Sequence, residues 1–246
     1  MSSYSPLGTN VCAVKYADDV TIILPVSKEN FSDMSSFHAE VEHFENWCLQ
    51  HQMKINHAKT KVLNVNFSPT PLPICSNLDN TYVLKMLGVL FDVRLSWSTH
   101  FDFIVKKASQ RLYVLRILKP LLCHDNLVTI FHALIQSLLD YASPVFLNAG
   151  SSLDSSFVVL CKRAFRIIHG PDKYCKSCDF LQVYRRRLHL SMKLFDQALS
   201  SPSHVLHDLI PPFSTRSARI ILPFVRTSRR AKGFFFHCSV VRNSTL

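Results

Sequence analysis

The first hundred residues contain several short apolar runs that are typical of β-strands and one segment with helical periodicity. The sequence VCAVKYADDVTIILP over residues 11–25 holds two apolar runs that flank Ala-Asp-Asp, and this pattern predicts a β-hairpin. From Phe31 to Cys48 the apolar residues recur in steps of three and four, which is typical of an amphipathic helix. Residues 62–67 and 82–91 read as further strands on either side of a proline-rich turn.

The period of the apolar positions becomes helical after about residue 95. Helices are predicted over approximately residues 101–118, 127–138, 157–168 and 179–199. The first should end before Pro120 and the third at Gly170, because proline stops a helix and glycine favours its C-terminus. The predicted fold class is therefore α+β, with a mostly helical second part and a basic tail after Pro211.

Composition limits the classes of protein to consider. The chain has 246 residues, of which 48% are apolar and 18% charged, so a folded protein with a sizeable core is expected. No apolar run reaches the ~18 residues of a membrane span, and no targeting signal is readable, which makes an intracellular location the default expectation. The 8 cysteines are predicted to be free thiols, since Cys48 and Cys161 lie within apolar helical patterns.

Charge is distributed unevenly along the chain. Residues 1–100 hold 7 basic and 9 acidic side chains, whereas residues 101–246 hold 21 basic and 8 acidic ones. Such a strongly basic second part indicates a polyanionic partner, and nucleic acid in particular. The alternative is a surface whose charge serves solubility alone.

Two basic clusters are the candidates for contact with phosphate groups. Lys162, Arg163 and Arg166 lie on one turn of the third predicted helix, and Arg185, Arg186 and Arg187 follow on the next. Such side chains bind the nucleic-acid backbone without reading its sequence. The alternative is that they form ordinary solvated helix faces.

One cysteine pair has the spacing of a zinc site. Cys175 and Cys178 are separated by two residues, as zinc ligand pairs often are. Two more ligands would be needed, and the candidates are His189, His204, His207 and Cys238, of which His204 and His207 form a local pair. The alternative is a chance Cys-x-x-Cys sequence in a loop that precedes a helix.

The adjacent acids Asp18 and Asp19 are the most distinctive candidate for chemistry. At a hairpin turn their two carboxylates concentrate negative charge in one place, and Mg²⁺ prefers oxygen ligands of this kind. The alternative is a surface hairpin, because aspartate is common in turns.

The order of several short motifs resembles that of one polymerase family. Tyr16-Ala17-Asp18-Asp19 resembles the active-site hairpin of reverse transcriptases, in particular those of non-LTR (LINE-type) retrotransposons. The segment at residues 53–61 looks like the Asn-x-x-Lys-Thr element downstream of that hairpin, and residues 85–92 look like the primer grip. Residues 95–97 with His100, residues 135–146 and residues 162–166 are similar to the thumb and its C-terminal extension, so the resemblance covers most of residues 11–210.

The resemblance implies a partial polymerase palm, an antiparallel sheet with a packed helix, over residues 1–95. A helical thumb would follow over residues 96–170 and a basic C-terminal extension over residues 171–246. Asp18 and Asp19 match the catalytic carboxylates that bind Mg²⁺ in a two-metal site. The implied partners are an RNA template, a DNA primer and deoxynucleotide triphosphates, and the implied location is the nucleus or cytoplasm.

Three further residues take roles from the same resemblance. Lys59 matches a catalytic lysine that stabilises the leaving pyrophosphate. Tyr16 matches the aromatic position next to the primer end. Gly88 matches a glycine that lets the backbone approach the primer, and its alternative is a simple strand bulge.

The sequence departs from this family at one essential position. The family needs a third carboxylate on a strand before the hairpin, and none of the 15 residues before Tyr16 is Asp or Glu. We therefore expect a truncated reverse transcriptase that cannot polymerise DNA as this chain alone. The alternative is a catalytically dead retroelement remnant that only binds nucleic acid.

Overall fold

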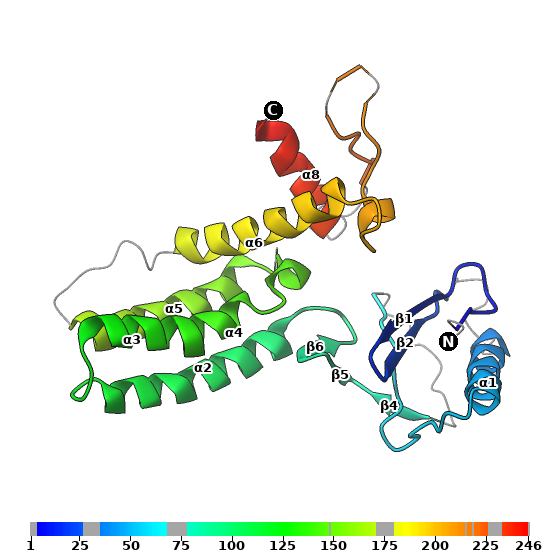
Figure 1. Ribbon diagram of the computed structural model, residues 1–246, viewed down its shortest axis with the longest axis horizontal. Coiled ribbons are helices and arrows are strands. Elements are labelled where there is room, and N and C mark those ends of the chain that lie inside the picture. Colours follow the sequence, from blue (N-terminus) through cyan, green and yellow to red (C-terminus); the bar gives the residue numbers. More distant parts are fainter. Residues whose placement is uncertain are drawn as a thin grey trace. The chain divides into compact units, whose positions relative to one another are not determined.

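The chain folds into two compact units, Met1–Leu95 (the N-terminal unit) and Ser96–Leu246 (the helical unit). The computed structural model describes residues 4–26, 35–67, 78–147, 149–170, 180–214, 216–217, 219–225 and 233–245 (Figure 1). The predicted α+β class is confirmed. The more specific expectation of a polymerase palm is not met, because the described strands form three separate two-stranded sheets. The division of the chain into three segments stays a prediction.

Two antiparallel hairpins and a short parallel pair make up the strands of the N-terminal unit. The predicted hairpin is confirmed as β1 (Cys12–Tyr16) and β2 (Asp19–Ile23), in which Tyr16 pairs with Asp19. The second hairpin joins β5 (Val83–Met86) to β6 (Val89–Asp92), where the sequence pattern predicted one continuous strand. The parallel pair is β3 (Lys61–Leu63) with β4 (Asp79–Thr81).

The break in the predicted strand lies at Leu87-Gly88. Both residues have positive φ angles, 46° and 83°, as a two-residue hairpin turn requires. Glycine adopts this conformation without steric cost, so the role of Gly88 in the structure is that of a turn residue. The two hairpins contact each other where the Thr21 hydroxyl donates a hydrogen bond to Sδ of Met86 over 3.1 Å.

The helix of the N-terminal unit, α1 (Ser35–Gln50), holds the start of the chain against it. The buried carboxylate of Glu40 accepts hydrogen bonds from the Tyr4 hydroxyl at 2.5 Å and from the Leu7 amide at 3.1 Å. Burial and the neighbouring carboxylate raise the pKa of Tyr4, so its hydroxyl stays protonated and can donate this hydrogen bond.

The core of the helical unit is built mainly by α2 (Ser98–Leu118) and α5 (Ser151–His169). The rings of Phe101 and Phe157 stack with centroids 4.5 Å apart and are fully buried. Between these helices the chain forms α3 (His124–Phe131), a π-helical turn η1 (His132–Gln136), α4 (Ser137–Asp140) and a 3₁₀ turn η2 (Ser143–Phe146). The sequence predicted a single helix over residues 127–138, which the π-helical turn interrupts.

A second, smaller core lies where α6 (Phe180–Ser200) packs on α8 (Phe234–Thr245). Phe195 and Cys238 are fully buried there, and burial raises the pKa of the Cys238 thiol to about 12. The 3₁₀ turn η4 (His207–Leu209) follows α6. Cys48 and Cys161 are buried and neither is in a disulfide, as predicted. No described helix combines the length and apolarity that a membrane crossing requires.

Candidate nucleic-acid interface

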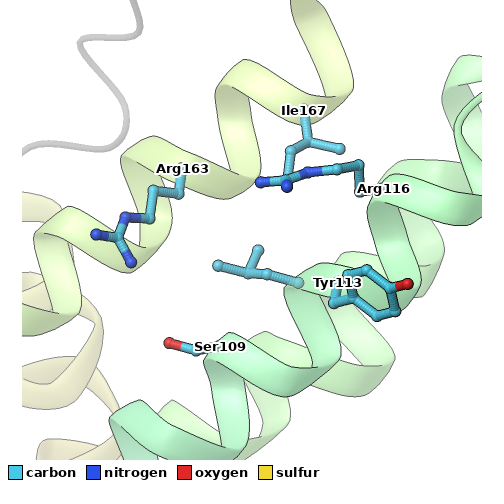
Figure 2. Close-up of a pocket in the computed structure, with 6 residues that line it drawn as sticks. Ser109, Tyr113, Arg116, Arg163 and Ile167 are labelled. Atoms are coloured by element: carbon cyan, nitrogen blue, oxygen red, sulfur yellow. The ribbon is translucent and has the colours of Figure 1, made fainter.

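A groove lies between α2 and α5 in the helical unit. Its volume is about 270 Å³. Leu112 and Ile167 supply apolar surface, and Tyr113, Arg116 and Arg163 supply an aromatic ring and two cations. Ser109 completes the lining of this feature, which we call the α2–α5 groove. Figure 2 shows Arg163 extending from α5 and Arg116 extending from α2 towards Ile167.

The helical periodicity of α2 explains why these side chains face outward. The apolar stripe of α2 is buried and consists of Phe101, Ile104, Ala108, Leu112 and Leu115. Tyr113 follows Leu112 and is therefore rotated off the stripe by about 100°. Its side chain is 62% exposed. Arg116 lies three residues further on, which places it on the same face as Tyr113.

The cations around the groove are not neutralised by acidic side chains. Arg116, Lys162, Arg163 and Arg166 are all exposed, and none of them forms an ion pair with any residue that the structure describes. Arg111 differs from them, since its guanidinium donates a hydrogen bond to the backbone carbonyl of Leu134. The positive charge at the α2–α5 groove is thus available to an anionic partner.

The first predicted basic cluster coincides with this site. Lys162, Arg163 and Arg166 lie on one exposed stretch of α5, and Arg163 itself lines the groove. Lys162 and Arg166 are four residues apart, so they lie on one side of the helix beside Arg163. Phosphate contact at these residues stays a prediction, and the structure is compatible with it.

The second predicted cluster is divided between the core and the surface. Arg187 is only 3% exposed and pairs with the buried Asp154 over 2.5 Å, so it is not accessible to a phosphate and differs from the prediction. Arg186 binds the Asp140 carboxylate through two nitrogens, at 2.6 and 2.8 Å, and this hydrogen-bonded pairing raises the pKa of Arg186. Arg185 is exposed. The helical repeat explains the division, because consecutive residues point about 100° apart.

Asp18 and Asp19 do not form a metal site together with other residues that the structure describes. Asp18 and Asp19 are both exposed at the turn, where Ala17 has a φ of 54°. Within the described ranges, no group of three or more His, Cys, Asp or Glu side chains is placed to hold a metal ion. Two exposed carboxylates do not complete the two-metal site that nucleotidyl transfer needs, so we derive no step through Mg²⁺.

The other residues predicted around that hairpin are not joined to its carboxylates. Lys59 is exposed in a turn that is held by Thr60 and Asn56, and it forms no ion pair with any described residue. Tyr16 is 64% exposed beside the turn. Cys175 and Cys178, the predicted zinc pair, lie outside the described residues.

One family matches part of the helical unit. Residues 97–137 match the family described as "Alkylated DNA repair protein alkB homolog 8, N-terminal". The match covers α2, α3, η1 and the first residue of α4, and it includes Ser109, Tyr113 and Arg116 of the α2–α5 groove. No curated protein and no solved structure matches the chain at a significant level.

This match corrects the interpretation of the chain as a reverse transcriptase. The segment around Trp97 and His100, which the motif order assigned to the start of a polymerase thumb, belongs to the stretch that matches the other family. The retrotransposon resemblance and the RNA-directed DNA polymerase activity implied by it, in both the active and the remnant form, are therefore wrong. Short motifs in the right order were not sufficient evidence for that family.

Sequence reasoning missed the α2 side of the groove. The basic clusters on α5 and α6 stand out as runs of adjacent cations, whereas Arg116 is isolated in the sequence and acquires its neighbours only through the packing of α2 on α5. Tyr113 carried a usable signal, because it is an aromatic residue that falls off the apolar stripe of a strongly periodic helix.

Proposed function

We propose that the helical unit binds nucleic acid, through the α2–α5 groove and the basic surface of α5 beside it. The observation that carries this proposal is a cluster of four exposed cations at a groove that has an exposed aromatic ring. The four cations have no acidic partners among the described residues, and they are Arg116, Lys162, Arg163 and Arg166. Cations of this kind contact the phosphate backbone and release its counterions.

Two further observations support nucleic acid as the ligand. Residues 101–246 hold 21 basic and 8 acidic side chains, an excess larger than solubility requires. The family that matches residues 97–137 is described as the N-terminal part of an alkylated DNA repair protein. Both observations concern the part of the chain that forms the groove.

Binding of this kind should depend steeply on salt. For a single strand, each phosphate contact contributes about −0.7 to the slope of log affinity against log salt, so four contacts give a slope of about −3. The affinity of the full-length chain for a labelled oligonucleotide should then fall roughly 50-fold between about 50 and 200 mM salt. Fluorescence anisotropy with oligonucleotides of equal length measures the slope of log affinity against log salt for RNA and for DNA.

The competing explanation is a basic surface that serves solubility alone. It gives no saturable binding at the lower salt concentration, for RNA or for DNA. Saturable binding whose affinity does not change with salt would also contradict the proposal, since phosphate contacts with Arg and Lys cannot be independent of salt.

A further inference from the structure

The α2–α5 groove combines surfaces that suit the two halves of a nucleotide. Leu112 is 5% exposed and Ile167 is partly buried, and together they give the groove an apolar base. Arg163 on α5 and Arg116 on α2 also line the groove, and Arg116 extends towards Ile167 (Figure 2). The flat aromatic face of a nucleobase and its charged phosphate match this division of apolar and cationic surface.

Core packing does not explain the position of Tyr113 in the groove. Its ring is 62% exposed, although the adjacent Leu112 contributes to the buried core. Every base has an aromatic face, so an exposed ring beside cations is a sequence-tolerant stacking platform for the bases of a single strand. In a duplex the faces of the bases are already covered by their neighbours, and an exposed ring gains little from it.

The size of the groove limits what it can accept. Its volume of about 270 Å³ lies just below the ~300–1,000 Å³ of pockets that enclose drug-sized ligands. It is lined by side chains of α2 and α5, among them the exposed Tyr113, Arg116 and Arg163. A single base that stacks on Tyr113, with its phosphates bound by Arg116 and Arg163, fits such a site better than an enclosed small molecule does.

We infer that Tyr113 stacks on an unpaired base, and that the α2–α5 groove therefore prefers single-stranded nucleic acid to duplex. This inference rests on the proposed function and adds the form of nucleic acid that the site selects. Arg116 and Arg163, which line the groove together with Tyr113, contact the phosphates of the same strand, and guanidinium groups can themselves contact the ring of the next base.

The test compares three variants of the full-length chain by fluorescence anisotropy. Each is titrated into a labelled 12-nucleotide single strand and into the same strand annealed to its complement. Tyr113→Ala should weaken binding of the single strand by about 5- to 150-fold and leave duplex binding nearly unchanged. Tyr113→Phe, which keeps the ring, should bind the single strand within about threefold of the wild type, since stacking needs the ring and not the hydroxyl.

The matched control is Tyr82→Ala, which removes an 81% exposed tyrosine from the N-terminal unit. It should leave both affinities unchanged. Circular dichroism and thermal melting of Tyr113→Ala should match the wild type, because the exposed ring contributes little to the core.

The outcomes separate this inference from the proposed function. If Tyr113→Ala binds the single strand as the wild type does while salt-dependent binding persists, the stacking inference is overturned and the proposed function stands. Equal loss of single-strand and duplex binding would also overturn the inference. If the wild type binds neither form, or binds an acidic peptide such as poly-glutamate as tightly as RNA, the proposed function fails as well.

Discussion

Replacement of Arg187 by methionine is expected to lower the free energy of unfolding by about 3–5 kcal/mol, because it leaves a buried charge without its partner. The guanidinium of Arg187 pairs with Asp154 over 2.5 Å, and both side chains are at most 5% exposed. Arg187 also donates hydrogen bonds to the carbonyls of Phe146 and Leu147, each at 3.4 Å. Its guanidinium lies 5.4–5.9 Å from the ring centroids of Phe101, Phe146 and Phe157. Urea denaturation of the full-length chain measures the effect.

Two further variants identify the cause of this loss. The double variant Arg187→Met with Asp154→Leu removes both charges, and it should recover most of the lost stability because no unpaired carboxylate remains. Arg186→Met is the matched control on the preceding residue, where the ion pair with Asp140 is partly exposed and its removal should cost less than about 1 kcal/mol. An Arg187→Met variant within 1 kcal/mol of the wild type would contradict the buried pair.

Reversal of two charges at the groove is expected to have the largest effect on binding. Arg116→Glu combined with Arg163→Glu should weaken oligonucleotide binding at least about 100-fold at low salt, since each lost hydrogen bond to a charged group contributes about 1.5–3 kcal/mol. The salt slope should also become shallower, by roughly 0.7 for each lost phosphate contact. Anisotropy titrations at several salt concentrations measure both quantities.

A matched double variant controls for the change in net charge. Arg216→Glu with Arg219→Glu alters the net charge by the same amount at two exposed positions away from the groove lining. It should weaken binding only a few-fold through the general field of the protein. If the two double variants bind equally weakly, net charge and not the α2–α5 groove determines binding.

Local patterns were sufficient to predict most elements of this fold. The hairpin over residues 12–23 follows from two β-rich runs around a polar turn, and α2, α5 and α6 follow from apolar residues at steps of three and four. The strand predicted over residues 82–91 was wrong because its turn residues, Leu87 and Gly88, interrupt a continuous apolar run without a polar signal. Leucine is not a typical residue for a turn of this kind.

The candidate site was harder to predict, because it depends on packing between helices. The three consecutive arginines of α6 looked equivalent in the sequence, yet Arg187 faces the core and finds Asp154, 33 residues earlier in the chain. No local pattern indicates that partner. Tyr113 and Arg163 likewise line one groove only because α2 packs on α5. The role of the Asp18-Asp19 pair stays a prediction, since an acidic turn in one hairpin does not by itself define a catalytic centre.

Photocrosslinking tests most directly whether the α2–α5 groove is the nucleic-acid site. The full-length chain is irradiated with a thiouridine-containing single-stranded RNA, digested, and the crosslinked peptides are identified by mass spectrometry. We expect crosslinks within residues 109–116 of α2 and 162–167 of α5, and their loss when excess unlabelled RNA competes. Crosslinks confined to the hairpin over residues 12–23, or to the exposed positions of α6, would contradict this account.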